Sequence, residues 1–465
     1  MSRKISQDAF NQLVKEIVTE LEVTPEEAVE DAVLQLQAQG VDLTNIRKSI
    51  ALNFIPPQEI RPLEIAVNSL DELLHEGAEK DAIIDDVKFL CEACGKSTGH
   101  KVFMGKTDFV RLAFDILHRF PDDVELCAMV LKALVHITTD QPDILGSNVG
   151  YNMSLFLERE LDENCLNLLL TWMKVACIKH EENRQNIVES NCIPLLKNVL
   201  ESSLEVPSII KGVFSTFRAL TLDDDIRVEF GQAHENARKI AEATLATMIK
   251  LLKKYKSEKE VVGEVILTLS AVIVRNEYCE KLLDIREGES LSYILDVFVN
   301  FPDSEKLNRQ CMRLLKVLAG SDKVKGEIIK AGAASIIVMA MTRLRQSAQL
   351  IAAGNGCIAA LTLRSSSNSQ AFCDADAPEV ILDGMRTHKQ DLSVQKQGCW
   401  AIRNMVSRNR DICPVFLELG AEELINYILQ TYSDQCEYDA KAALRDLGCK
   451  VDLREEWTGE GGALN

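Results

Sequence analysis

A pattern of about 43 residues recurs along most of this 465-residue chain. Its clearest copy, "NRQNIVESNCIPLLKNVL" from Asn183, combines a polar turn, a short apolar helix, a break and a second amphipathic segment. Equivalent positions in successive copies are Val102, Ile144, Ile187, Glu229, Leu282, Ile328, Ala371 and Val415. The steps between them are 42, 43, 42, 53, 46, 43 and 44 residues. Helical repeats of this length must stack to bury their apolar faces, so the period predicts a solenoid.

The last segment of each period is the longest and the most apolar. Examples are "CLNLLLTWMKVACI", "VVGEVILTLSAVIV" and "VQKQGCWAIRNMV". Apolar side chains on nearly every side of a helix indicate that it packs between neighbours. Each repeat is therefore predicted to contain a short first helix, a second helix and a long, buried third helix.

This layout resembles the armadillo repeat, through the spacing, the pair Ile193 and Pro194 in a second helix, and the third helix "GCWAIRN". The resemblance covers about residues 63–450 and implies an all-α, right-handed superhelical solenoid of about eight three-helix repeats. It also implies a protein-interaction scaffold or adaptor that is not an enzyme and needs no cofactor. Four further segments resemble one family within this superfamily, namely "GVDLTNI", "DDDIRVEFGQAH", "IVRNEYC" and "AKAALRDLGCKVDLREEWTG".

The two ends of the chain differ from the repeats. One amphipathic helix is predicted over residues 5–21, and a second follows a capping box at Thr24 and stops at Gly40. The prolines of "NFIPPQEIRP" predict a non-helical linker. The predicted limits are an acidic helical segment at 1–52, the linker at 53–62, the solenoid at 63–450 and a polar tail at 451–465.

Composition limits the partners. The chain has 71 acidic and 52 basic residues and a formal net charge of -19, which disfavours direct binding to nucleic acid. No apolar run is long enough to span a membrane, and the N-terminus lacks the apolar core of a signal peptide. We expect a monomer in the cytosol or the nucleus that binds other proteins, not a membrane or a small-molecule substrate.

One cluster has the residue types of a metal site. Cys91, Cys94 and His100 in "CEACGKSTGH" offer three of the four ligands of a zinc ion. No second pair follows at a zinc-ribbon spacing, and "DDVKFLCEACG" is typical of a helix that ends at Gly95. The motifs of hydrolases, P-loop proteins and zinc proteases are also missing from the sequence. We therefore expect no metal, and a metal-dependent enzyme is the weakest alternative.

In armadillo proteins the third helices line a concave groove, and importin-alpha relatives place there a Trp, an Asn four residues later and often an acid. The eighteen corresponding positions of the six central repeats hold five arginines and no acid. Guanidinium groups suit carboxylate and phosphate, so we predict an extended, acidic or phosphorylated peptide partner. An importin-like adaptor for basic cargo is the alternative. The candidate groove residues are Trp172, His180, Phe214, Arg218, Arg275, Arg313, Arg364, Trp400, Asn404 and Arg408.

The candidate groove residues can also be explained by purely structural roles. The aromatic residues Trp172, Phe214 and Trp400 can be core residues wedged between third helices. Arginines near the C-terminal ends of helices are favoured by the helix dipole, whatever the protein binds.

The stretch "LTLDDDIRVEFGQAHENARKI" interrupts the period. Asp225 is predicted to be the N-cap of the next first helix. The step of 53 residues places about ten extra residues near 231–240, between a first and a second helix. Insertions in solenoids often carry the binding role. The predicted insertion surface consists of His234, Glu235 and Asn236.

Overall fold

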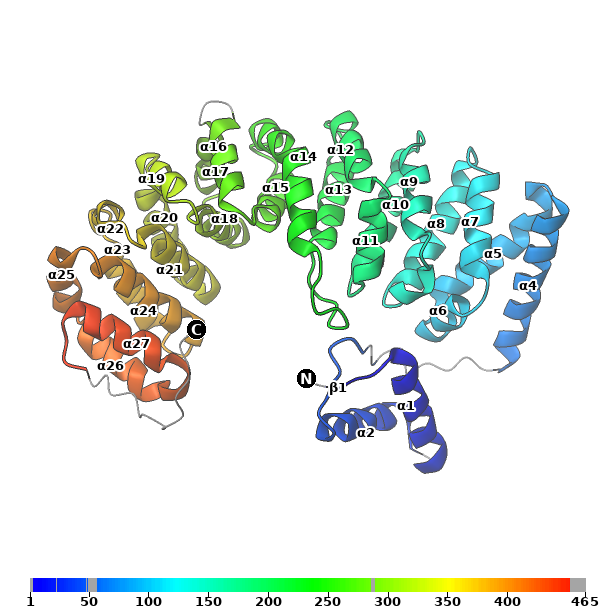
Figure 1. Cartoon of the computed structure of the whole chain (residues 1–465), viewed down its shortest axis with the longest axis horizontal. Helices are drawn as coiled ribbons and strands as arrows, with labels where there is room; N and C mark the ends of the chain where they lie inside the picture. Colours follow the sequence, from blue (N-terminus) through cyan, green and yellow to red (C-terminus); the bar gives the residue numbers. More distant parts are fainter. Residues whose placement is uncertain (1–2, 22, 47, 49–56, 286–288, 452–465) are drawn as a thin grey trace. The chain divides into compact units, whose positions relative to one another are not determined.

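A computed structural model describes residues 3–21, 23–46, 48, 57–285 and 289–451 of the chain. Helices form nearly all of the regular structure in these ranges (Figure 1). The chain divides into two compact units, unit 1 (Met1–Thr244) and unit 2 (Leu245–Asn465). The predicted all-α solenoid of armadillo repeats is confirmed in each unit.

Unit 1 begins with a small lobe that has its own core. Its two helices are α1 (Gln7–Leu21) and α2 (Pro25–Ala38), and α2 starts at the predicted capping box of Thr24. A short parallel pairing of β1 (Arg3–Lys4) with β2 (Val41–Asp42), which the sequence did not predict, joins the two ends of the lobe. The lobe core contains Phe10, Val14, Ala28, Ala32, Val41 and Ile46. Because these buried residues form a core of their own, the lobe is a folded element and not an extended arm.

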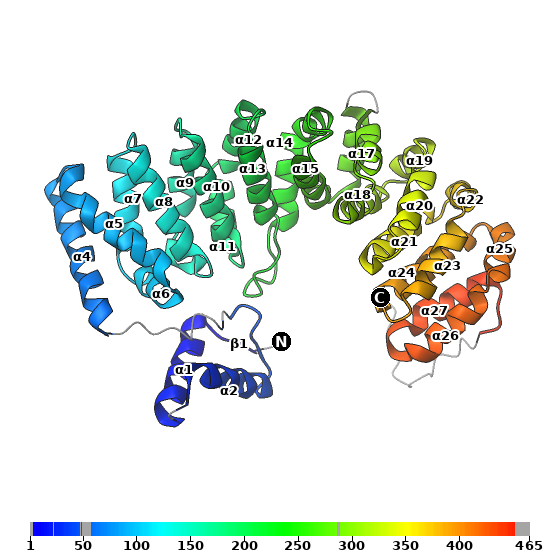
Figure 2. The ribbon, with the colours of Figure 1, turned by 180° about the vertical axis from the view of Figure 1, so that it is seen from behind.

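The repeats of unit 1 follow the lobe (Figure 1). A first pair consists of α4 (Pro57–Glu76) and α5 (Lys80–Lys96). The next repeats are α6 (Thr98–Gly105), α7 (Phe109–Arg119) and α8 (Val124–Thr138); η1 (Pro142–Leu145), α9 (Val149–Leu157) and α10 (Glu163–Cys177); and α11 (Glu181–Glu189), α12 (Cys192–Ser202) and α13 (Pro207–Leu220). The third helices α8, α10 and α13 lie side by side in both views (Figures 1 and 2).

Unit 2 repeats the same arrangement. The long helix α14 (Ala233–Lys254) spans the boundary between the units, and α15 (Lys259–Val272) follows it. The remaining repeats are α16 (Asn276–Asp284), α17 (Glu289–Asn300) and α18 (Glu305–Leu318); α19 (Asp322–Lys330), α20 (Ala333–Arg343) and α21 (Ala348–Thr362); α22 (Ser366–Cys373), α23 (Ala377–Thr387) and α24 (Leu392–Val406); and η3 (Arg410–Ile412), α25 (Cys413–Glu418), α26 (Ala421–Thr431) and α27 (Ser433–Leu447). The third helices α18, α21, α24 and α27 pack in series.

The predicted period holds at all but one repeat. Seven of the eight equivalent positions lie in short first helices, from Val102 in α6 to Val415 in α25. The exception is Glu229, which lies in a loop. The predicted third helices are present and buried, because their apolar residues contact helices on both sides.

The predicted linker at 53–62 is partly wrong. Residues 53–56 lie outside the described ranges, but α4 already starts at Pro57 and contains Pro62. Proline is tolerated at the first helical position because its missing N–H has no partner there in any helix. Pro62 removes one backbone hydrogen bond, and burial of Leu63, Ala66 and Leu70 on the same helix compensates for it.

Candidate functional site

The structure places two of the candidate groove aromatics in the core. Trp172 and Phe214 have no exposed surface, so they cannot contact a groove ligand. The Trp172 Nε1–H donates to Thr138 Oγ1 over 3.0 Å, and its ring lies 5.7 Å from that of Phe114. These two residues therefore have the structural role that was the alternative to binding. A third helix inside the stack buries an aromatic ring that points at the neighbouring helix.

His180 is also a structural residue and not a groove residue. It is buried and caps α11, where its Nδ1 accepts from the Asn183 N–H over 3.1 Å. Its Nε2 lies 3.1 Å from Asp143 Oδ1. Both ring nitrogens are therefore engaged within unit 1.

The acidic stretch at 223–225 does cap a helix, but not the one predicted. No helix follows Asp225; the loop continues to Gln232. Instead Asp224 Oδ1 accepts from the Lys179 N–H and Asp225 Oδ2 from the Glu181 N–H, each over 3.0 Å. The two carboxylates thus meet the positive N-terminal end of α11, in the preceding repeat.

A buried ion cluster fixes this loop on the repeat. Arg184 is almost fully buried; its Nε lies 2.7 Å from Glu181 Oε2 and its Nη1 2.7 Å from Asp224 Oδ1. Arg227 pairs with Asp225 over 2.8 Å. A loop that is held by buried charge pairs has a defined conformation, since breaking either pair would leave a carboxylate without its cation.

The same cluster contacts the N-terminal lobe. Asn45 Nδ2 donates to Asp225 Oδ1 over 3.2 Å, and Lys179 Nζ donates to the carbonyl oxygen of Thr44. Lys106 Nζ also lies 3.8 Å from Asp8 Oδ1, in α1 of the lobe. These polar contacts join the lobe to the repeats within unit 1.

The predicted insertion is wrong in its position, and one of its three predicted surface residues is buried. The extra residues do not separate two helices; the first helix is replaced by a loop, and the second helix, α14, is lengthened to 22 residues. Asn236 is buried, and its Nδ2 donates to the carbonyl oxygen of Leu220 over 3.1 Å. Glu235 pairs with Arg238 over 2.6 Å, whereas His234 is exposed.

The loop also exposes two apolar residues that were not among the predicted site residues. Phe230 is 82% exposed, and Val228 is partly exposed beside it. The available signal was "RVEFG", in which apolar side chains alternate with charges directly before a glycine. Such exposed aromatic residues on a fixed loop are typical of contact points for another protein.

The ion cluster predicts a pH dependence of stability. Burial alone would raise the pKa of Asp225, but hydrogen bonds from Arg227, the Glu181 N–H and Asn45 outweigh it and hold the pKa well below the usual range. A carboxylate whose pKa is lowered in the folded state stabilises that state at every pH above its unfolded pKa of about 3.9. This contribution to stability is lost as the pH falls through the pKa of the folded state. We expect the thermal midpoint of unit 1 to fall between about pH 5 and pH 2.

The variant D225N tests this cause. It should be less stable than the natural chain at pH 7 and lose less of its stability on acidification, as measured by calorimetry across a pH series. Asp223 is exposed, so D223N is the matched control and should follow the natural curve. Parallel pH curves for D225N and the natural chain would contradict the assignment.

The predicted arginines occupy three kinds of position. Arg313 is exposed in the middle of α18. Arg275, Arg364 and Arg408 are exposed, but they lie in the turns that follow α15, α21 and α24. The helix dipole favours a cation at Arg364 and Arg408, which directly follow helix C-terminal ends, but not at Arg275, which is the N-cap of α16. Arg218 is partly exposed in the last turn of α13, in unit 1. Arg313 is therefore the one predicted arginine that is exposed in the middle of a third helix, where it can belong to a binding face.

We define the third-helix face of unit 2 by the residues that α18, α21 and α24 expose at helical spacing. The middle helix contributes only small residues, namely the partly exposed Ala353 and Ala360 and, between them, the buried Gly356. The two flanking helices contribute long polar and cationic residues, namely Arg309, Arg313 and Lys316 from α18, and Lys396, Gln397, Trp400, Arg403 and Asn404 from α24. Lys316 and Lys396 lie outside the three positions of each third helix to which the armadillo groove pattern refers.

The long side chains converge over the small ones. A Cβ at Gly356 would lie 2.6 Å from Gln397 Oε1 and 3.4 Å from Lys316 Nζ, so a larger residue would displace both. Gln397 Oε1 has no hydrogen-bond partner among the described residues. Neither Lys316 nor Arg313 forms an ion pair with any described residue. Arg313 and Lys316 are therefore exposed cations without an ion-pair partner among the described residues, whereas the Gln397 Oε1 atom is buried.

Trp400 and Asn404 lie at one border of this face. Trp400 is 41% exposed, and its Nε1–H donates to Asp439 of α27. Asn404 Nδ2 donates to the carbonyl oxygen of Ala359 over 2.8 Å. The acids of α27 are already engaged, since Asp446 lies 2.8 Å from Arg445 and 3.7 Å from Arg403. The positive charge of α18 is therefore not neutralised by α27 residues.

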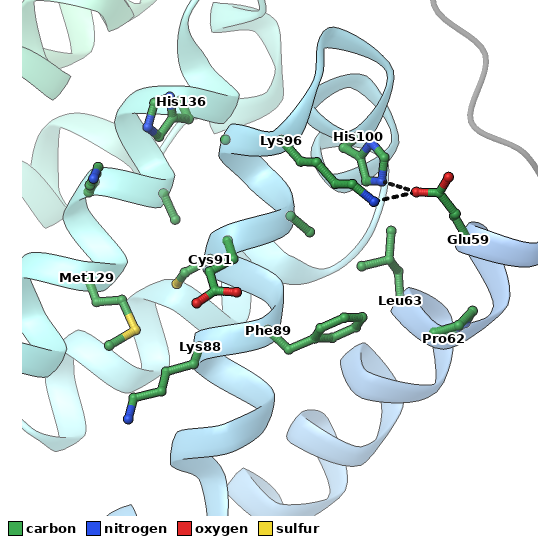
Figure 3. A pocket seen from close by; sticks show the side chains of 15 residues that line it. Glu59, Pro62, Leu63, Lys88, Phe89, Cys91, Lys96, His100, Met129 and His136 are labelled. Carbon is green, nitrogen blue, oxygen red and sulfur yellow. Dashed lines mark hydrogen bonds and ion pairs between the residues drawn. The ribbon is translucent and has the colours of Figure 1, made fainter.

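Unit 1 contains a large cavity where the sequence shows the cysteine pair. It has a volume of about 930 Å³ and lies between α4, α5 and α8 (Figure 3). Cys91 lines it, whereas Cys94 is buried in the core. Burial raises the pKa of the Cys91 thiol to about 12, and His100 faces Glu59 over 3.1 Å. Among the described residues, no three His, Cys, Asp or Glu side chains are grouped to hold a metal ion.

Across the described ranges, no helix is both long and apolar enough to cross a membrane. Solved structures share the fold. An engineered protein matches with a TM-score of 0.70 and 15% identity, over 95% of this chain and 99% of that chain. A structure from a study of a phosphorylation switch between cadherin and beta-catenin matches with a TM-score of 0.58 and 13% identity, over 82% and 69%. At these identities the likeness shows the fold alone.

Sequence comparisons identify the family. The ARMC6 family matches residues 65–465, and the armadillo repeat-containing protein 6 N-terminal domain matches residues 2–79. The armadillo repeat-containing protein 6 homolog of Drosophila melanogaster is 36% identical over 99% of this chain and 98% of its own length. Armadillo repeat-containing protein 6 of Homo sapiens is 32% identical over 100% of this chain and 94% of its own length. The chain therefore belongs to the armadillo repeat-containing protein 6 family.

Proposed function

We propose that this protein is a non-enzymatic interaction scaffold that binds an extended acidic or phosphorylated peptide across the third-helix face of unit 2. The armadillo-repeat fold supports a protein-interaction role in general. The acidic ligand is supported by one observation, the cations of α18 and α24 that flank the small residues of α21. Location in the cytosol or the nucleus and a monomeric state stay predictions.

The small residues explain why a chain fits there. Ala353 and Ala360 give the exposed part of α21 no long side chain, so a peptide backbone can approach it there, whereas Gly356 is buried beside Gln397 and Lys316. The cations on either side then reach carboxylates or phosphates of that peptide. Arg313 can bind such groups in a bidentate manner, while Lys316 and Lys396 act as mobile point charges.

An importin-like role for basic cargo is less well supported. It would need acids beside repeated Trp and Asn residues, but Arg313, Lys316 and Lys396 are cations. The single acid of α18 and α24, Glu305, already pairs with Arg309 over 3.4 Å. Asn404 belongs to the single complete Trp and Asn pair, and its amide already donates to Ala359. A basic peptide would meet repulsion from Arg313 and Lys316.

The test is a charge reversal. The triple variant R313E, K316E and K396E should weaken binding of a fluorescent phosphoserine- and aspartate-rich peptide by about a hundredfold, because close charge pairs across an interface dominate such affinity. Fluorescence anisotropy at two salt concentrations measures it, and the natural chain should lose affinity at the higher salt.

Matched reversals elsewhere in unit 2 control for net charge. Lys256 and Arg345 lie in turns, and Lys323 lies in a first helix; all three are exposed. The variant K256E, K323E and R345E should keep the natural affinity. Equal loss in both triple variants, or tighter binding of a lysine- and arginine-rich peptide than of the acidic one, would refute the proposed function.

A further inference from the structure

The cavity between α4, α5 and α8 is built as a binding site of its own, and it lies in unit 1. Its volume of about 930 Å³ is in the range of ligand sites. Most of its wall is apolar, as Figure 3 shows for Leu63, Phe89 and Met129. The apolar lining consists of Pro62, Leu63, Phe89, Ala93, Met129 and Ala133.

One end of the cavity is closed by a self-satisfied polar cluster. Glu59 Oε2 lies 2.5 Å from Lys96 Nζ and 3.1 Å from His100 Nε2 (Figure 3). His100 Nδ1 in turn lies 2.8 Å from Ser97 Oγ. The hydrogen bond from Lys96 lowers the pKa of Glu59, so this carboxylate stays ionised and paired. The cluster fixes the first turn of α4 against α5 and α6, and it leaves no charge for a ligand.

The charge that remains for a ligand is positive and comes from both sides. Lys88 of α5 and Lys132 of α8 line the cavity, and neither forms an ion pair or hydrogen bond with any described residue. His136 adds no cation at neutral pH, because burial and the nearby Lys132 lower its pKa. Glu92 is the single acid of the lining outside the Glu59 cluster. An apolar wall between two unpaired lysines suits an apolar group attached to an anion.

The apolar surface also continues beyond the cavity. A second hollow of about 530 Å³ shares Pro62 and Phe89 with the first and extends along α4 to Ile65. Phe89 is 44% and Ile65 is 60% exposed. Two adjoining hollows with a shared aromatic wall exceed what one small molecule needs, and they fit an extended chain with two apolar side chains.

We propose that this double hollow binds a peptide segment in which two apolar side chains, leucine or phenylalanine, stand next to acidic residues. One apolar side chain enters between Phe89 and Met129, and the other packs on Ile65. The neighbouring carboxylates pair with Lys88 and Lys132. The inference rests on unit 1 alone and does not depend on the third-helix face of unit 2.

The experiment uses the full-length R313E, K316E and K396E variant, so that the third-helix face of unit 2 cannot contribute. The probe is a fluorescent peptide with two leucines among aspartates. Replacing both leucines of the probe by alanine should weaken binding by about a hundredfold or more, since each buried leucine contributes about tenfold to a hundredfold. Added to this background, F89A or the pair K88E and K132E should each weaken binding by about tenfold.

Matched changes in unit 1 and on α14 act as controls. Tyr151 is 61% exposed on α9, so Y151A controls for the loss of an exposed ring. Lys239 and Lys250 are exposed on α14, so K239E with K250E controls for net charge. Both controls should keep the affinity of the background. As a second readout, the methyl resonance of Met129 should shift on addition of the probe, and that of the buried Met153 should not.

Two results would overturn the inference. One is equal affinity of the background, F89A and the K88E with K132E variant for the leucine probe. The other is equal affinity for the probes with and without leucine, together with an unmoved Met129 resonance. Loss of binding to the phosphoserine probe in the triple variant, with an intact response to the leucine probe, would separate the two proposals.

Discussion

Replacing Arg184 by methionine is expected to destabilise unit 1 by about 3–5 kcal/mol, the usual effect of removing one partner from a buried ion pair. The guanidinium contacts Glu181 and Asp224, each over 2.7 Å, and also donates to the carbonyl oxygen of Cys177. Methionine keeps much of the volume but leaves the two carboxylates without their cation. Urea unfolding followed by Trp172 fluorescence, in a chain whose other tryptophans are phenylalanine, measures the change.

A surface arginine provides the comparison. Arg111 pairs with Asp71 over 2.8 Å and with Asp115 over 3.1 Å, but its side chain is 47% exposed. R111M should change stability by no more than about 1 kcal/mol, because exposed ion pairs contribute little. Adding E181L and D224N to R184M should recover part of the loss, since the uncompensated carboxylates are then gone. An R184M effect as small as that of R111M would contradict the role of the cluster.

Replacing Trp172 by alanine is expected to cost about 3–5 kcal/mol, as for other large side chains removed from a core. The ring has no exposed surface, and its loss leaves a cavity between α8 and α10. The Thr138 hydroxyl, fully buried, also loses its donor. W172F should cost less, about 1–3 kcal/mol, because it keeps most of the apolar contact and loses mainly the hydrogen bond. Thermal unfolding followed by circular dichroism checks both values.

Trp400 is the matched control for that substitution. It occupies the equivalent position in its repeat but is 41% exposed. W400A should therefore change stability by about 0.5 kcal/mol or little more. A W400A effect equal to that of W172A would show that both rings are core residues, and it would remove Trp400 from the candidate face.

Much of the fold could be predicted from the sequence because it depends on local patterns. The capping box at Thr24 and the stop at Gly40 bound α2 as expected, since both act within one helical turn. Third helices such as α10 were recognised from apolar residues on every side. The proline rule failed at α4, because burial of Leu63 and Leu70 outweighs the single hydrogen bond lost at Pro62.

The candidate site could be predicted only in part. The sequence indicated an excess of arginine over acid at third-helix positions, and Arg313 lies on the face as expected. The repeat spacing does not distinguish Trp172, which is buried in the core, from the equivalent Trp400, which is partly exposed. Nor could it show that Lys316 and Gln397, from different helices, converge over Gly356.

The sequence by itself determined that this protein is a stack of three-helix repeats, because each helix follows from periodicity and caps within a few residues. Only the tertiary structure decided which side chains meet across the stack. Arg184 contacts Asp224, 40 residues away, and Asp225 caps the helix that begins at Glu181, 44 residues away. These partners lie about one repeat apart, so stacking brings them together. Burial in a medium of low polarity then makes their charge pairing matter for stability.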